Sequence, residues 1–127
     1  MTTDPHSLPI LIVEDDEPTQ NLLRAVLLRG GYTTEMASDG RQAIALLQAK
    51  QYAAVVLDMM MPEVSGSDVL AFLGAATSPA PVVICSAAGA ASLTGFDPRV
   101  VKAVVRKPFD IDQLTGTIKS VVAASRA

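Results

Sequence analysis

The chain has 127 residues, half of them hydrophobic, and a formal net charge of −3. This length fits one domain, and an acidic chain without a run of Lys or Arg argues against a nucleic-acid-binding surface. One cysteine excludes an internal disulfide and suits a reducing compartment. The sequence shows neither a signal-peptide pattern nor an apolar run long enough to span a bilayer, so it predicts a cytoplasmic protein without membrane contact.

The chain begins with a polar stretch, residues 1–8, which predicts a flexible tail ahead of one domain over residues 9–127. Residues 10–13 form a short apolar run that is typical of a buried strand. Four acidic residues, 14–17, follow at once, and Pro18 suits the first turn of a helix.

The next segment predicts a helix, an edge strand and a second helix. Gly30 and Gly31 mark the end of the first helix, and the half-polar residues 33–37 predict an edge strand. Asp39 and Gln42 have the spacing of a helix-capping pair. Apolar residues recur at helical spacing in both helices: Leu22, Leu23, Val26 and Leu27 in the first, and Ala43, Ile44, Leu46 and Leu47 in the second.

A third apolar run, residues 53–57, predicts a buried strand that stops at Asp58. The residues after Asp58 include a proline and a Ser-Gly pair, so they predict a loop before a helix over residues 66–76. The inward positions of that helix are Val69, Leu70, Phe72 and Leu73. Residues 82–85 predict a fourth strand with Ser86 at its end.

Residues 102–106 predict a fifth strand that ends at Lys107, and a final helix, capped by Asp110 with Gln113 three residues on, follows it. The inner face of that helix carries Ile111, Leu114, Ile118, Val121 and Val122. Buried strands that alternate with helices predict a parallel sheet covered on both faces. We therefore predict a single doubly wound (βα)5 domain of the flavodoxin-like α/β class, with strand order 2-1-3-4-5.

Polar side chains follow four of the predicted strands, and the carboxyl ends of parallel strands meet at one edge of a sheet. Glu14, Asp15 and Asp16 follow the first strand, Asp58 the third, Ser86 the fourth and Lys107 the fifth. Carboxylates in one pocket repel each other, and a hard divalent cation such as Mg²⁺ would remove that penalty. Lys107 and Ser86 suit phosphoryl oxygens, so the set favours phosphoryl transfer to Asp58 as the nucleophile.

Five stretches of the chain resemble the receiver domain of two-component response regulators, over essentially the whole length. They are ILIVEDDEP, GGYTTEMASDG, VVLDMMMPEVSG, PVVICSA and VVRKPF. Each alone is modest evidence, but together and in this order they make a strong signal. The resemblance implies a switch that accepts a phosphoryl group from a histidine kinase or a histidine phosphotransfer protein, and that catalyses only its own phosphorylation and dephosphorylation.

The resemblance also assigns roles to the matching residues. Asp58 would be the phosphoacceptor. Asp15 would coordinate Mg²⁺ directly, Glu14 through water, and Met60 through its backbone carbonyl. These roles make the acidic cluster both the metal site and the site of phosphorylation.

On the phosphoryl side, the resemblance implies that Ser86 donates a hydrogen bond and that Lys107 neutralises charge. A cis Lys107–Pro108 bond would aim the lysine inward. The chain departs from the family at Val104, where receivers commonly carry Tyr or Phe as a rotamer switch. A second departure is the glycine-rich segment 87–98, which leaves room for one or two helical turns at most, so the signal could instead travel as ordering of that segment.

The resemblance implies two partner surfaces. The candidates for docking the phosphoryl donor are Pro18, Leu22, Pro108 and Phe109. The output surface for a downstream protein or domain would be the predicted fourth helix, fifth strand and fifth helix. Whether phosphorylation drives dimerisation stays open, as does the choice between a stand-alone receiver and a piece of a longer regulator or hybrid kinase.

Other interpretations of single residues stand beside these. An isolated Asp58 would most often be a strand-end cap, but the company of Glu14, Asp15 and Lys107 reverses that preference. Further residues are interpreted without a role in the chemistry: Asp16 and Glu17 as a solvated loop, Cys85 as a small buried hydrophobe, His6 as part of the tail and Met59 to Met61 as loop packing.

Three other functions fit the sequence less well. A phosphatase of the haloacid dehalogenase type has a second Asp two residues after the nucleophile, where this chain has Met60. Nucleotide or flavin binding needs a glycine-rich loop after the first strand, and acidic residues occupy that place. The alternative that Val104 keeps open is a degenerate receiver that binds proteins independently of phosphorylation.

Overall fold

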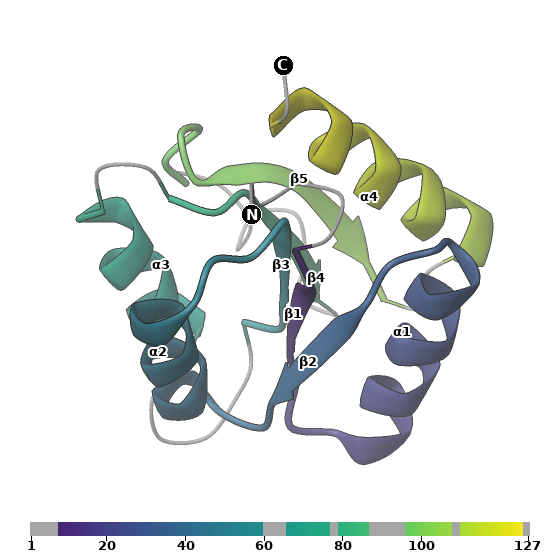
Figure 1. The fold of residues 1–127 in the computed structure, drawn as a ribbon, viewed down its shortest axis with the longest axis horizontal. Helices are drawn as coiled ribbons and strands as arrows, with labels where there is room; N and C mark the ends of the chain where they lie inside the picture. Colours follow the sequence, from purple (N-terminus) through teal and green to yellow (C-terminus); the bar gives the residue numbers. More distant parts are fainter. Residues whose placement is uncertain (1–7, 60–65, 77–78, 87–95, 108–109, 126–127) are drawn as a thin grey trace, which may run out of the picture.

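The computed structural model describes residues 8–59, 66–76, 79–86, 96–107 and 110–125, apart from the side chains of Ser86 and Ser125. In chain order, the elements are β1 (Ile10–Val13), α1 (Glu17–Arg29), β2 (Thr34–Ala37), α2 (Gly40–Ala49), β3 (Ala54–Leu57), α3 (Gly66–Gly74), β4 (Val82–Ser86), β5 (Val101–Arg106) and α4 (Ile111–Ser125), as Figure 1 shows. The helical turns predicted for residues 87–98 fall largely on residues 87–95, outside the described part.

The five strands form one parallel sheet in the order β2-β1-β3-β4-β5, so the predicted topology is confirmed. The central strands β1 and β3 are buried along their whole length. Burial on both faces explains why their sequences are unbroken apolar runs rather than alternating ones. The half-polar strand β2 lies at an edge and is only partly buried, as its composition predicted.

Helices cover both faces of the sheet: α1 and α4 pack on one face, and α2 and α3 on the other (Figure 1). Successive strand side chains point to opposite faces. In β1, Ile10 and Ile12 therefore join the core under α1 and α4, whereas Leu11 and Val13 join the core under α2 and α3. Within the described ranges, no helix is both long and apolar enough to cross a bilayer.

Both helix-capping pairs predicted from the sequence are confirmed. Asp39 Oδ1 accepts a hydrogen bond from Gln42 N at 2.8 Å, and Gln42 Oε1 accepts one from Ser38 N at 3.0 Å. Asp39 thus satisfies a backbone donor that the first turn of α2 would leave free, and Gln42 satisfies the backbone donor of Ser38 just before the helix. At the start of α4, Asp110 Oδ1 accepts a hydrogen bond from Gln113 N at 3.1 Å.

Several predicted boundaries, most of them by one residue at the end of a strand, and one predicted orientation differ from the structure. Helix α3 ends at Gly74 rather than at residue 76, and Ser86 belongs to β4 rather than following it. Ile111, predicted on the inner face of the last helix, is 47% exposed. The reason is its position: it opens α4 at the carboxyl edge of the sheet, one turn before Leu114, the first residue of the helix that is fully buried.

Candidate functional site

Glu14 and Asp58 lie side by side because of the way β1 pairs with β3. The strands are parallel and in register, with Val13 opposite Leu57, so the residues that follow them meet at the carboxyl edge. Asp58 N donates a hydrogen bond to Val13 O at 2.9 Å, which holds Asp58 against the end of β1. Both side chains are nearly buried, with 1% of Glu14 and 7% of Asp58 exposed.

Asp15 completes a cluster of three carboxylates. One carboxylate oxygen from each of Glu14, Asp15 and Asp58 lies within 4.8 Å of the other two. Asp15 is exposed, so the cluster opens to solvent on its side. The fold therefore brings together the three acids that the sequence predicted at this edge, close enough for their negative charges to repel.

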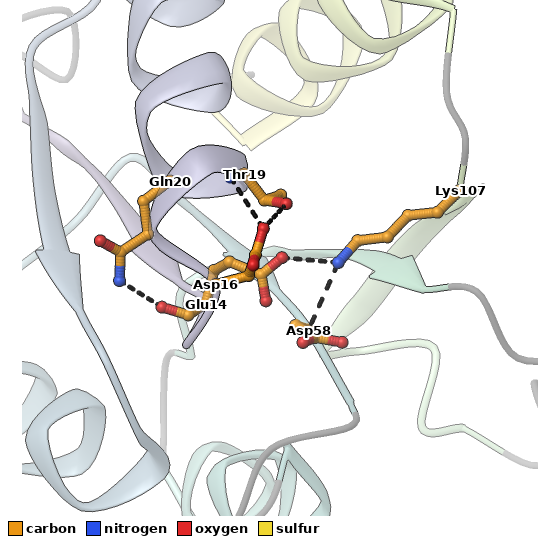
Figure 2. A network of polar contacts seen from close by, with 6 residues as sticks. All are labelled: Glu14, Asp16, Thr19, Gln20, Asp58 and Lys107. Atoms are coloured by element: carbon orange, nitrogen blue, oxygen red, sulfur yellow. Dashed lines mark hydrogen bonds and ion pairs between the residues drawn. The ribbon is translucent and has the colours of Figure 1, made fainter.

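Lys107 reaches the same cluster from β5, two strands away from β3 in the sheet. The last residue of β5, Arg106, pairs with Ser86 of β4, so Lys107 leaves the sheet at its carboxyl edge. Its Nζ lies 2.5 Å from Glu14 Oε1 and 3.9 Å from Asp58 Oδ2. Figure 2 shows the ammonium reaching towards both carboxyl groups from the side opposite to Gln20.

Burial and crowding shift two pKa values in this cluster. Burial of the Glu14 carboxyl, together with the neighbouring Asp58, raises the pKa of Glu14 from 4.5 to about 7, although Lys107 opposes the rise. Burial alone would lower the pKa of Lys107, but the hydrogen bond to Glu14 and the charges of Asp58 and Glu14 outweigh it and raise that pKa. Lys107 is therefore a permanent cation at neutral pH, while Glu14 ionises only near neutrality.

The donor set fits a hard divalent cation. Glu14 Oε2 is buried and, among the described residues, has no hydrogen-bond partner. A buried ionised oxygen without a partner is costly unless a cation or water satisfies it. Carboxylate oxygens are the ligands that Mg²⁺ and Ca²⁺ take in proteins, and the open side at Asp15 leaves room for water ligands.

Asp16, interpreted from the sequence as part of a solvated loop, is instead the N-cap of α1. Its Oδ2 accepts hydrogen bonds from Thr19 Oγ1 at 2.5 Å and from Thr19 N at 3.0 Å. The hydrogen bonds from Thr19 hold the pKa of Asp16 below its usual value, and Figure 2 shows the carboxylate turned towards Thr19. The signal in the sequence is an Asp two residues before Pro18, the arrangement of a capped helix start.

Gln20 is a buried polar residue near the cluster that was not predicted from the sequence. Only 8% of it is exposed. Its Nε2 donates a hydrogen bond to the Glu14 backbone carbonyl and lies 3.4 Å from Ser38 Oγ. The available signal was its position on the buried stripe of α1, three residues before Leu23 and seven before Leu27.

The remaining candidate residues are placed as follows. Val104 lies on β5 and is 37% exposed, and Pro18 and Leu22 are exposed on α1. Cys85 is the small buried hydrophobe that the sequence predicted, and burial raises the pKa of its thiol to about 11. Outside the described part lie Met60, Pro108, Phe109 and the side chain of Ser86, and with them the predicted cis bond.

The sequence matches the family described as the response regulator receiver domain over residues 10–119. The transcriptional regulatory protein TcrA of Mycobacterium tuberculosis is 34% identical over 114 residues, which cover 88% of this chain and 45% of TcrA. The response regulator MprA of Mycolicibacterium vanbaalenii is 32% identical over 115 residues, which cover 89% of this chain and 49% of MprA. The chain thus spans about half the length of these curated relatives.

Solved structures agree with the family match. The receiver domain of the Francisella response regulator 1452 is 25% identical with a TM-score of 0.82, and the match covers 93% of this chain and 98% of that one. The response regulator TrrA from Thermotoga maritima, in complex with Mg²⁺ and BeF, is 25% identical with a TM-score of 0.80, over 90% of this chain and 98% of that one. The chain therefore belongs to the family of response regulator receiver domains of two-component signal transduction.

Proposed function

We propose that this receiver domain accepts a phosphoryl group on Asp58 and changes its partner binding as a result. The observation that carries the proposal is the cluster of Glu14, Asp15 and Asp58 oxygens within 4.8 Å of one another. The Lys107 ammonium beside the cluster, 3.9 Å from Asp58, supports it. A carboxylate nucleophile next to a fixed cation and further acidic ligands is the set that phosphoryl transfer to an aspartate needs.

The transfer starts from a carboxylate oxygen of Asp58, which attacks the phosphorus of the donor in line with the leaving group. An O–P bond forms while the P–N bond of a phosphohistidine donor breaks; the imidazole nitrogen keeps the electron pair and takes up a proton from solvent. The hydrogen bond from Asp58 N to Val13 O holds the nucleophile at the end of β3 during this exchange. The product is an acyl phosphate on Asp58.

Lys107 is proposed to balance the negative charge of the phosphoryl oxygens. Its raised pKa keeps the ammonium charged, and a fixed positive charge is most effective where transition-state charge develops. In the described arrangement the ammonium lies closer to Glu14, at 2.5 Å, than to Asp58, at 3.9 Å. Ser86 is proposed as the hydroxyl that donates a further hydrogen bond, on the resemblance alone.

We propose Mg²⁺ as the cofactor, held by Glu14, Asp15 and Asp58, and by the carbonyl of Met60 on the resemblance alone. When bound, the ion neutralises charge on the phosphoryl oxygens. Two observations support this choice: the all-oxygen donor set and the unpartnered Glu14 Oε2 among the described residues. The similar TrrA structure is a complex with Mg²⁺ and BeF.

The phosphoryl donor is proposed to be a histidine kinase or a histidine phosphotransfer protein. Pro18 and Leu22 support a docking site on α1, because both are exposed near the acidic loop; Pro108 and Phe109 are proposed to extend that site. We propose that the domain over residues 9–127 itself makes no nucleic-acid contact, given its net charge of −3.

The output surface is proposed to comprise β5, α4 and the segment between β4 and β5. Val104 belongs to this proposed surface and is 37% exposed. Because it is not aromatic, we propose that phosphorylation reaches this surface without a rotamer switch at position 104. Partner binding or dimerisation through this surface would then follow the state of Asp58.

The test is to treat the chain with acetyl phosphate and Mg²⁺ and to follow it by intact-protein mass spectrometry. The wild-type chain should gain the mass of one phosphoryl group, and Asp58→Asn should not. Asp112→Asn is the matched control, because Asp112 is an exposed acid in the first turn of α4. Labelling that persists in Asp58→Asn would contradict the proposed nucleophile, and an unlabelled wild-type chain that still binds a partner would favour the phosphorylation-independent binding module.

A further inference from the structure

Gln20 is an amide buried on the face of α1 that packs against the sheet. It shares that face with the core residues Leu23 and Leu27, and only 8% of it is exposed. A buried amide is costly unless its polar atoms are hydrogen-bonded, so an apolar residue would be the cheaper choice at this position. The hydrogen bonds of Gln20 therefore indicate what the amide does.

The Gln20 side chain reaches back along the chain to the loop between β1 and α1. Its Nε2 donates a hydrogen bond to the backbone carbonyl of Glu14. A carbonyl oxygen can only accept, so the orientation of the amide follows from its partner. Figure 2 shows Gln20 meeting the backbone of Glu14 on one side, while Lys107 meets the Glu14 carboxylate on the other.

The same contact fixes the peptide plane that joins Glu14 to Asp15. The Glu14 amide on the other side of the residue donates to Ala37 O at 3.1 Å. Glu14 is thus held at its N–H by β2, at its carbonyl by Gln20 and at its carboxylate by Lys107. Because this peptide plane is fixed, the direction in which the chain continues from Glu14 into Asp15 is fixed as well.

Gln20 also ties this loop to the segment after β2. Its Nε2 lies 3.4 Å from Ser38 Oγ, and Ser38 N donates to Gln42 Oε1 at the start of α2. The first and second loops at the carboxyl edge are therefore connected through one amide. An acidic loop anchored in this way cannot relax easily away from Asp58 under charge repulsion.

We infer that Gln20 is a positioning residue for the metal site: it holds the Glu14–Asp15 peptide plane so that both carboxylates face the same divalent cation as Asp58. Gln20 contacts the backbone and not the ligand oxygens, so it acts through Glu14 and Asp15. Residues that orient ligands commonly govern metal affinity because they reduce the reorganisation needed for binding. The inference rests on the proposed function, which supplies the cation.

The experiment measures the Mg²⁺ dissociation constant of the full chain by isothermal titration calorimetry. Gln20→Met keeps the length of the side chain but has no N–H to donate, and it should weaken Mg²⁺ binding about tenfold. Gln20→Asn keeps the amide on a shorter side chain that cannot reach Glu14, and it should show the same loss. Asn21→Met is the matched control, because Asn21 is the exposed amide next to Gln20 on α1, and it should bind Mg²⁺ as the wild type does.

A parallel unfolding curve in EDTA separates positioning from stability. A purely structural Gln20 would change the unfolding midpoint but leave the Mg²⁺ dissociation constant of the folded chain unchanged. A ligand-orienting residue is expected to change the Mg²⁺ dissociation constant about tenfold. If the folded variants Gln20→Met and Gln20→Asn instead had dissociation constants within about twofold of the wild-type value, the inference would be wrong. The proposed function would remain intact. A wild-type chain that binds no Mg²⁺ would contradict the proposed function itself and remove the basis for the inference.

Discussion

Lys107 Nζ and Glu14 Oε1 are 2.5 Å apart, although the two residues come from opposite ends of the domain. The Glu14 side chain is 1% exposed and that of Lys107 is 23% exposed, so the pair is largely shielded from solvent. In such a setting the attraction between the charges offsets the cost of taking them out of water, and removing one partner leaves the other uncompensated.

Replacing Lys107 with Met should therefore destabilise the metal-free protein by about 3 kcal/mol at about pH 8, the low end of the range for a broken buried pair. The physical reason is that Lys107 lowers the pKa of Glu14, so without it the carboxyl would either face Asp58 without a counter-ion or have to take up a proton at pH 8. Urea unfolding in EDTA measures the change in the free energy of unfolding.

The control is Lys102→Met, because Lys102 is an exposed lysine on β5, the strand that Lys107 follows, and its Nζ donates to the backbone carbonyl of Pro98. It should change stability by less than about 1 kcal/mol. As the pH falls below the pKa of Glu14, neutral Glu14 needs no counter-ion, and the effect of Lys107→Met should shrink. Equal effects of the two substitutions at pH 8 would show that the pair does not contribute.

A second prediction concerns the balance between repulsion and cation binding in the acidic cluster. Asp58→Asn removes one of three carboxylates that lie within 4.8 Å of one another, so the metal-free variant should be at least as stable as the wild type. Mg²⁺ at a hundred times its dissociation constant should stabilise the wild type by about 2.7 kcal/mol, and the same Mg²⁺ concentration should stabilise Asp58→Asn much less. Thermal unfolding with and without Mg²⁺ measures both effects.

Asp112→Asn again serves as the control and should keep the full Mg²⁺ response, because Asp112 is an exposed acid of α4 outside the cluster. If Asp58→Asn gained as much from Mg²⁺ as the wild type, Asp58 would not be a ligand.

A third prediction tests the close approach of Gly66 to the backbone at the nucleophile. A Cβ added at Gly66 would lie 2.8 Å from Met59 Cα and 2.9 Å from Asp58 O. Backbone atoms cannot move aside as a side-chain end can, so Gly66→Ala should displace the end of β3 and destabilise the protein by about 1–3 kcal/mol. Phosphorylation of Asp58 by acetyl phosphate should slow as well, and mass spectrometry over time would measure the rate.

The matched control is Gly116→Ala in α4, where an added Cβ meets none of the described residues within 4 Å. Alanine in an open helical position should stabilise by about 0.5–1 kcal/mol. Gly66→Ala that behaves like Gly116→Ala, with unchanged labelling, would show that the contact does not constrain Asp58.

The sheet and its acidic edge could be predicted from sequence because both follow from local patterns. Apolar runs identify β1 and β3, and their parallel register alone brings Glu14 next to Asp58. No local pattern specifies the partner of Lys107. The sequence placed the lysine at the right edge, but its closer contact with Glu14 rather than Asp58 depends on side-chain packing across two strands.

The roles of Asp16 and Gln20 were harder to predict, for a different reason. An acidic stretch after a strand suggests a solvated loop, and the hydrogen bonds from Thr19 that make Asp16 a helix cap depend on where α1 begins. Gln20 interrupts an apolar stripe of α1. Its role follows from the hydrogen bond to the Glu14 carbonyl, which only the three-dimensional structure shows.

A last prediction concerns Glu35, which joins the edge strand β2 to the segment before β3. Its Oε1 accepts a hydrogen bond from Tyr52 Oη at 2.8 Å, and its Oε2 accepts one from Lys50 Nζ at 2.9 Å. The hydrogen bond from Lys50, followed by that from Tyr52, lowers the pKa of Glu35 below 4.5. A lowered pKa means that the stabilisation is present above pH 4.5 and is lost as the pH falls through the folded-state pKa.

Glu35→Gln should therefore lower the free energy of unfolding by about 1 kcal/mol at neutral pH, and the difference from wild type should vanish in acid. Urea unfolding at a series of pH values between neutrality and acid measures this convergence. Tyr52→Phe is the control: it removes one hydrogen bond from a buried ring but leaves the Lys50 pair intact, so it should retain part of the pH dependence. A Glu35→Gln deficit that stays constant across the series would mean that the ionised carboxylate contributes nothing, and that the loss comes from packing alone.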